Sequence, residues 1–344
     1  MSIFLALILS FFQPDVACAE YFTGLMIDSS TNLLLRPDGR SGSLVSLYGG
    51  MRHTVFDASM TYNVDTGFIE HYEGLQYQRH DIEVYYQPLE SARGFWGIAL
   101  SGGITRFGEV TVLEGYEEYG ALSTAKYYLT PLTLVRWEVH GMKRSYRDFP
   151  TEDFDELETF LRLDRFFPFG LTLRAQVDTG VRRYSSDEDA PSSTLFGLRF
   201  RAAKSLGPQW GIWAETFTTD ISFSDTPADT TGLYDRIFLD DPYKYSKYGL
   251  ILNTKYLPSE RGSIQLRTGF IKRTYDDALS GSYWYLPSGG WEENEISAYL
   301  TLAYLPSWFE GIAIPSVEVY YIDVDASIAF LSYRSFGATV RFER

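Results

Sequence analysis

The stretch LTLRAQVDTGV, residues 171–181, decides the fold class of this chain. Leu, Leu, Ala and Val stand at every second position from 171 to 177, and Arg174, Gln176 and Asp178 lie between them. A β-strand points successive side chains to opposite faces, whereas the residues on one face of a helix recur every three to four positions. The stretch is therefore predicted to be a strand with one apolar and one polar face.

The same alternation recurs in TLVRWEVHGMKR (133–144), SSTLFGLRFRA (192–202) and SIQLRTGF (263–270). After residue 12 the chain has no stretch of roughly twenty apolar residues, the length that a membrane-spanning helix requires. Many half-apolar strands are compatible with a soluble sandwich or barrel, or with a membrane barrel whose apolar face is turned outward. The distribution of turns separates these two architectures.

Short turns and long polar loops alternate along the chain. Seven short turns, often with a Pro beside an aromatic residue, occur near residues 52–56, 87–94, 129–133, 166–170, 204–210, 256–262 and 304–311. Eight longer connections occur near residues 36–43, 64–74, 108–120, 147–155, 185–193, 223–244, 274–291 and 322–328. Short turns at one end and long loops at the other are typical of outer-membrane barrels. The prediction is an all-β, transmembrane, antiparallel up-and-down barrel with about sixteen strands of nine to eleven residues, or fourteen as the alternative.

The composition supports this interpretation. Tyr (26), Phe (24) and Trp (7) are abundant, apolar residues make up 45% of the chain, and the formal net charge is −15. So much apolar and aromatic surface argues against disorder, and the negative charge argues against a nucleic-acid partner. Aromatic residues gather beside the short turns, where a girdle at the lipid headgroups is expected: Trp96, Tyr127, Phe166, Phe167, Phe169, Trp210, Tyr256, Tyr304 and Trp308.

The N-terminus predicts export. An apolar run in MSIFLALILSFF is followed by Pro14 and by the small residues of ACA, which is typical of a secretory signal peptide over residues 1–19. Cleavage after Ala19 would remove Cys18, so that the mature barrel, residues 20–344, would contain no cysteine. Strand-like sequence begins at once after this point, so we expect no separate plug domain.

The C-terminal stretch SFGATVRFER, residues 335–344, alternates almost to its end. Its Ser335, Gly337, Val340 and Phe342 resemble the C-terminal assembly signal of bacterial outer-membrane β-barrel proteins, although Glu343 and Arg344 follow the last aromatic residue. The resemblance is porin-like and points to no subfamily. It implies recognition by the barrel-assembly machinery, contact with outer-membrane lipid, a location in the bacterial outer membrane, and possible homotrimers.

Charged residues fill the polar faces of the predicted strands. The candidates for the lumen and its selectivity are Arg136, Glu138, Arg144, Glu158, Arg162, Asp164, Arg174, Asp178, Arg182, Arg199 and Arg201. Charges need water or one another, so the lumen is predicted to be a water-filled channel for passive diffusion of small hydrophilic solutes. The alternative is that these residues pair across neighbouring strands and only stabilise the wall. The inserts 223–244 and 274–291 are candidates for an inward-folding constriction.

Two other functions remain open. The barrel could be closed or plugged, with a structural, receptor or adhesion role. It could also be a hydrolase with a site at its rim, for which only His71, beside Glu70 and Glu73, is suitably placed. No G-x-S-x-G motif occurs, and the acidic clusters match no calcium loop. The sequence therefore predicts no enzyme, no metal site and no cofactor.

Overall fold

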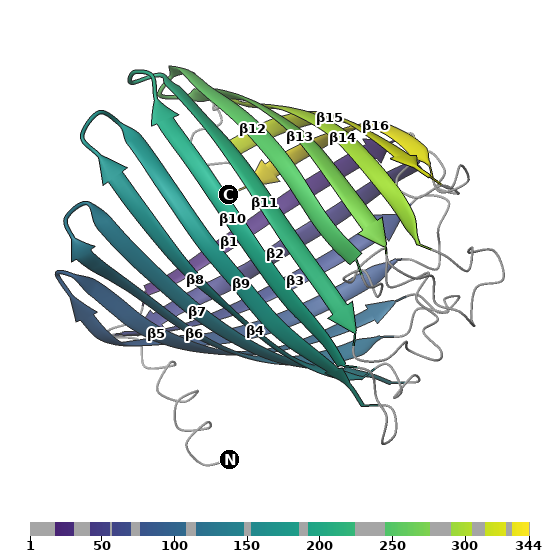
Figure 1. Cartoon of the computed structure of the whole chain (residues 1–344). Coiled ribbons are helices and arrows are strands. Elements are labelled where there is room, and N and C mark those ends of the chain that lie inside the picture. Colours follow the sequence, from purple (N-terminus) through teal and green to yellow (C-terminus); the bar gives the residue numbers. More distant parts are fainter. Residues whose placement is uncertain are drawn as a thin grey trace, which may run out of the picture.

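The computed structural model describes residues 18–30, 42–55, 57–69, 76–107, 115–147, 153–185, 192–223, 245–275, 290–304, 314–327 and 332–343. Sixteen antiparallel strands form one closed barrel (Figure 1). They are β1 (Cys18–Ser30), β2 (Gly42–Val55), β3 (Ala58–Ile69), β4 (Tyr77–Ser91), β5 (Gly94–Phe107), β6 (Tyr116–Thr130), β7 (Thr133–Tyr146), β8 (Phe154–Phe167), β9 (Leu171–Tyr184), β10 (Ser192–Ser205), β11 (Trp210–Phe223), β12 (Tyr245–Ser259), β13 (Gly262–Tyr275), β14 (Trp291–Tyr304), β15 (Ile314–Ala326) and β16 (Tyr333–Glu343). The predicted fold class and the count of sixteen are confirmed.

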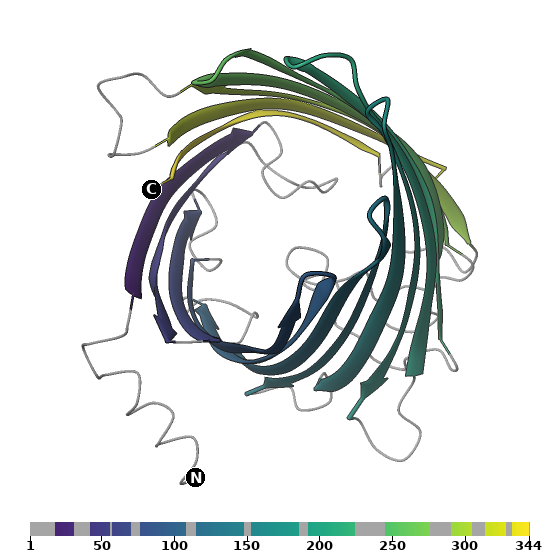
Figure 2. The same cartoon turned by 90° about the vertical axis from the view of Figure 1, so that its left-hand side faces the viewer.

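Each strand pairs with its neighbours in the sequence, and β16 closes the barrel against β1. In this closing pair, residues 24–30 lie antiparallel to residues 337–343. Figure 2 shows the strands arranged as a closed wall around the interior. An up-and-down barrel of this kind leaves no strand edge unpaired, which a lipid environment requires.

The strands are longer than the sequence predicted. They contain from 11 residues in β16 to 15 in β4, rather than nine to eleven. Parts of three predicted loops are strand: β3 continues to Ile69, β6 begins at Tyr116 and β15 continues to Ala326. Hydrogen bonds to neighbouring strands hold these polar segments in the sheet beyond the length needed to cross the bilayer.

Proline marks two irregularities at the turn end of the barrel. The register between β4 and β5 shifts between Tyr86 and Leu89, where Pro88 lies, and the register between β12 and β13 shifts between Tyr256 and Ser259, where Pro258 lies. Proline has no N–H to donate to a neighbouring strand, so it is tolerated where a bulge interrupts the pairing. At the β8–β9 turn, Gly170 has φ of +76°, a conformation that favours glycine.

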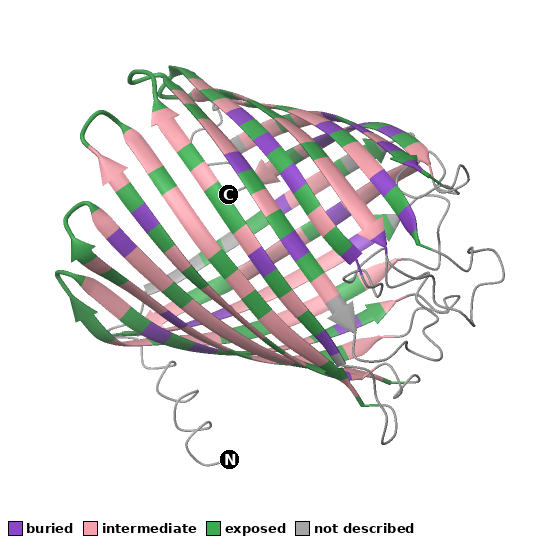
Figure 3. Ribbon diagram, viewed as in Figure 1, coloured by how far each residue is buried: buried purple, intermediate pink, exposed green. Residues whose placement is uncertain are grey.

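Large apolar side chains face outward. Buried and exposed residues alternate along the strands (Figure 3), and most of the exposed large apolar residues share the outward face. Near the turns this face carries Trp96, Tyr127, Trp210, Tyr256 and Tyr304 of the predicted girdle. Phe166 differs from the prediction because it falls on the inward face, and Trp308 lies outside the described residues.

A second group of outward aromatic residues lies toward the loop end, and includes Tyr119, Tyr248 and Phe336. On β6, Tyr119 and Tyr127 are separated by about 26 Å of strand at ~3.3 Å per residue, which a tilt of roughly 40° reduces to about 20 Å, slightly less than the roughly 25 Å apolar band of outer-membrane barrels. Beyond this group outward charges begin, as with the Lys272–Glu292 pair at 2.7 Å. The strands therefore continue past the apolar band on the loop side. Within the described residues, no helix is long and apolar enough to span a membrane.

Candidate functional site

The polar face of the barrel points inward. The register aligns the charged positions of β6–β11 in rows that alternate with the exposed apolar rows. We call this inner surface of β6–β11 the charged wall. It carries all eleven residues predicted to line the lumen: Arg136, Glu138, Arg144, Glu158, Arg162, Asp164, Arg174, Asp178, Arg182, Arg199 and Arg201.

Asp164 is the centre of the strongest cluster on the charged wall. Its side chain is 2% exposed, its Oδ1 accepts a 2.6 Å hydrogen bond from Arg174 Nε, and its Oδ2 forms an ion pair with Arg162 at 3.1 Å. Arg136 lies next to this cluster on β7, where it binds Glu138 at 2.7 Å. A buried carboxylate needs such partners, since its burial without a cation would be costly.

Other pairs link adjacent strands. Arg201 binds Glu215 on β11 at 2.6 Å, and its guanidinium lies 4.3 Å from the centre of the Trp213 ring. Arg199 binds Asp178 on β9 at 3.1 Å. Both signs of charge thus lie side by side on one wall, and the cross-strand pairing considered from the sequence is present.

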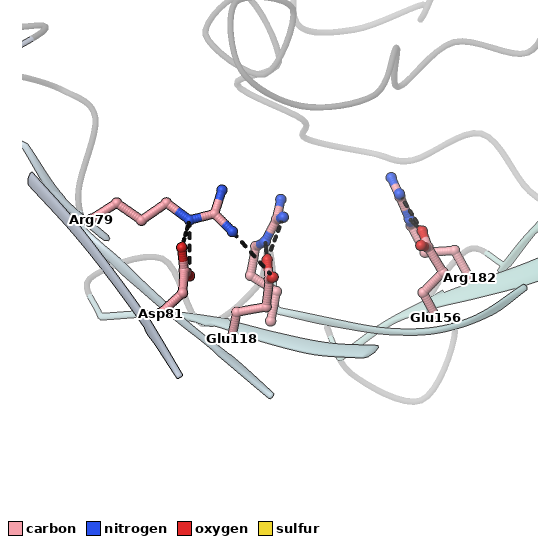
Figure 4. A network of polar contacts seen from close by, with 6 residues as sticks. Arg79, Asp81, Glu118, Glu156 and Arg182 are labelled. Carbon is pink, nitrogen blue, oxygen red and sulfur yellow. Dashed lines mark hydrogen bonds and ion pairs between the residues drawn. The ribbon is translucent and has the colours of Figure 1, made fainter. Parts of the chain in front are cut away.

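A further network links the loop half of the charged wall to β4. Figure 4 shows that Arg79, Asp81 and Glu118 lie together, and that Arg182 binds Glu156 separately. Glu118 also accepts from Arg144 at 2.6 Å, so that it joins β6 to β7. The sequence analysis missed Arg79, Asp81 and Glu118, although the period-two spacing of the first two was a usable signal.

Aromatic rings hold the arginines of this network in place. The Arg144 guanidinium lies 4.5 Å from the Tyr116 ring centre and 5.2 Å from that of Phe154. Arg182 lies 4.3 Å from the Phe154 ring centre. Cation–π contacts and ion pairs together restrict these side chains to the wall.

Two cavities open along the charged wall. One, of about 210 Å³, is lined by Glu156, Asp178, Arg182 and Arg199, among other residues. The other, of about 330 Å³, is lined by residues that include Glu138, His140, Glu158 and Asp178. Such polar, charged hollows favour water and hydrophilic solutes over apolar ones.

The opposite side of the lumen is different from what the sequence predicted. Tyr320, Ile322 and Val324 of β15 form a buried apolar cluster on the inward face, with Tyr299 and Tyr333 packed against it. We call these five residues the apolar wall. The sequence predicted that arginines concentrate on the strands around residues 136–201, which form most of the charged wall, but it did not predict this apolar cluster.

The predicted assembly signal forms the seam of the barrel. Ser335 and Gly337 face the lumen. Val340 and Phe342 face outward, where they pair with Ile27 and Leu25 of β1.

A Cβ on Gly337 would lie 2.4 Å from the Tyr320 ring and 2.8 Å from the Ser29 carbonyl oxygen. Glycine is therefore needed for close packing at this position. Recognition of the signal by an assembly machinery stays a prediction.

No family model and no curated protein matches the chain. Solved structures share its fold. A bacterial polysaccharide outer membrane secretin aligns with a TM-score of 0.54 and 8% identity, over 94% of this chain and 97% of that one. Pseudomonas aeruginosa OccK3 (OpdO) aligns with a TM-score of 0.51 and 11% identity, over 95% of each chain. Pseudomonas aeruginosa OprD aligns with 0.51 and 10%, also over 95% of each.

These likenesses establish the fold, which is that of outer-membrane β-barrels. The sequence prediction of an outer-membrane barrel is confirmed at this level, and no subfamily is singled out. The likenesses leave the solute, the selectivity residues and the predicted homotrimer open.

Proposed function

We propose that this chain is an outer-membrane channel through which small hydrophilic solutes diffuse passively. The observation that carries the proposal is the charged wall. Its ion pairs stand on the inward face of a closed barrel, beside polar cavities and opposite an apolar outward face. Sixteen strands enclose enough space for an aqueous channel, whereas eight leave room only for side chains.

We propose a channel rather than an enzyme on the same evidence. His140 lies on the charged wall. His80 lies on the outward face, where its Nδ1 and the Tyr62 hydroxyl share a 2.8 Å hydrogen bond. Neither arrangement includes a nucleophile activated by a base and its orienting partner. His71, the one suitably placed rim histidine, lies outside the described residues.

Solute flux tests the proposal. Vesicles that contain the full-length barrel should swell in polyols and small sugars, at rates that fall steeply with solute size, while vesicles without protein stay intact. A folded barrel that gives no swelling with any solute would overturn the channel and favour a closed barrel with a structural or receptor role.

Passage of carbohydrate chains is the second candidate. Tyr299 and Tyr333 on the apolar wall are only partly buried, and aromatic rings can stack on the apolar faces of sugars. One structure with the same fold is named as a polysaccharide outer membrane secretin. In the swelling assay, this candidate predicts that linear oligosaccharides enter faster than polyols of equal mass.

Three cations in the turn half of the lumen are expected to raise its permeability to anions. Lys126, Lys255 and Arg341 fall on inward positions there, and none forms an ion pair with a carboxylate among the described residues. We expect the triple change of these residues to Gln to lower the Cl⁻/K⁺ permeability ratio about twofold or more, because uncompensated charges in a narrow lumen enrich counter-ions. The ratio follows from the reversal potential in a KCl gradient. The outward Lys272→Gln change is the control, and an equal shift in both variants would contradict the assignment.

A further inference from the structure

The outward face of β8–β12 carries an apolar groove that is separate from the lumen. Its volume is about 490 Å³. In the register, Ala175 and Ala202 lie beside Leu and Phe side chains on neighbouring strands, so the small residues form a floor between taller walls. The floor is Ala175, Ala202 and Ala214, and the walls include Leu163, Phe200 and Leu250.

The walls of this groove are exposed rather than covered by the protein. Leu163 is 44% exposed, Phe200 54% and Leu250 45%. These residues stand in one row across five strands, since Leu163 pairs with Ala175, Ala175 with Phe200, Phe200 with Thr216 and Thr216 with Leu250. The groove therefore lies on the membrane-facing surface, open to whatever occupies the hydrocarbon around the barrel.

Two cations lie at the turn side of the groove. Arg165 on β8 lines it, and Lys204 on β10 lies one row nearer the turns, with Leu171 and Leu173 of β9 between the two side chains. Arg165 donates to Thr133 Oγ1 and lies 5.8 Å from the Phe167 ring centre. Lys204 donates to the Phe169 carbonyl and lies 4.8 Å from the Phe169 ring centre.

These two side chains are exceptional on the outward face. In the described turn halves of the sixteen strands, Arg165 and Lys204 are the only Arg and Lys residues at outward positions. No Asp or Glu lies at an outward position there. Neither Arg165 nor Lys204 forms an ion pair with a carboxylate among the described residues. A cation at the edge of the hydrocarbon extends to the headgroup level, where the anionic groups of lipids attract it.

We infer that the groove binds an anionic glycerophospholipid, with an acyl chain over the alanine floor and the phosphate between Arg165 and Lys204. The phosphate supplies the negative charge that the outward strand positions lack. Arg165 and Lys204 stand on either side of β9, and their long side chains can turn to the phosphate from their contacts with Thr133 and Phe169. A second copy of this chain is disfavoured as the occupant, because its outward strand positions at this level offer no carboxylate.

Native mass spectrometry of the full-length barrel in mild detergent tests the inference. We expect wild type to hold one phosphatidylglycerol with about thirtyfold higher affinity than the Arg165→Gln/Lys204→Gln variant, as two cations beside an anionic headgroup would provide. Phosphatidylcholine with the same acyl chains should bind both proteins equally weakly. Ala202→Phe, which fills the groove but leaves both cations, should also lose the phosphatidylglycerol.

The matched control is Arg183→Gln/Lys272→Gln, which removes two outward cations from the loop half and should leave phosphatidylglycerol binding unchanged. Each variant is compared as folded protein, identified by its heat-modifiable mobility on a gel. Equal phosphatidylglycerol binding by wild type and the Arg165/Lys204 variant would overturn the headgroup site. Undiminished binding by Ala202→Phe would overturn the groove. An oligomer that Ala202→Phe dissociates without any change in lipid content would assign the groove to a second copy instead.

Discussion

Gly337→Val is expected to prevent most molecules of the variant from closing into a barrel. The added side chain starts 2.4 Å from the Tyr320 ring and 2.8 Å from the Ser29 carbonyl oxygen, so both the Tyr320 ring and the backbone of β1 must move. Overpacking at a seam of this kind costs about 3 kcal/mol. The substituted position also lies in the pair of β16 with β1, residues 24–30, and closure of the barrel depends on this pair. The folded fraction, measured by heat-modifiable mobility after refolding into vesicles, should fall below that of wild type by a large margin.

Gly102→Val is the control for this change. Gly102 lies on β5 at an outward position, and a Cβ there would meet Tyr119 only at 3.7 Å, an ordinary contact. It should refold like wild type. Tyr320→Ala combined with Gly337→Val should recover part of the folded fraction, because the ring that clashes is gone. Equal refolding of Gly337→Val and Gly102→Val would show that the seam tolerates a side chain and would refute the packing argument.

Asp164→Asn is expected to destabilise the folded barrel by about 3 kcal/mol. The change leaves Arg162 and Arg174 side by side without the carboxylate that both of them bind. Asp164 is 2% exposed, so water cannot replace its charge effectively. The free energy of unfolding in urea, measured in lipid vesicles, gives the value.

Glu292→Gln is the matched control for Asp164→Asn. Glu292 pairs with Lys272 on the outward face and is 49% exposed, so its loss should cost less than about 1 kcal/mol. Adding Arg174→Gln to Asp164→Asn should restore part of the stability by removing one of the two facing cations. If Asp164→Asn lowered the free energy of unfolding no more than Glu292→Gln does, the Asp164 cluster would stabilise the barrel no more than an exposed ion pair.

The strands were predictable because their signal is local. In 171–181 the alternation of side chains is enough to predict β9, and the hairpin connections follow from the short turns. Strand ends were less predictable, as in β15, which continues to Ala326 through a segment that reads as a polar loop. Pairing with β14 and β16 determines where such a strand ends, and this partner lies outside the local sequence.

The sequence predicts that arginines pair with carboxylates, but not which residues form each pair. The sequence alone offers several arginines as ion-pair partners for Asp164. The register of β8 with β9 selects Arg174. The apolar wall was missed for a related reason. In β15 the run from Val319 to Ile322 is apolar on both faces, with Glu318 before it on one face and Asp323 after it on the other, so the alternation does not tell which face is inward.

Single-channel recording in a planar bilayer tests the central claim, an open aqueous lumen, most directly. The full-length barrel, refolded and inserted into a bilayer in 1 M KCl, is predicted to give stable, uniform conductance steps, since the charged wall and its cavities keep water in the lumen. Barrels shown to be folded and inserted that carry no current would contradict the channel.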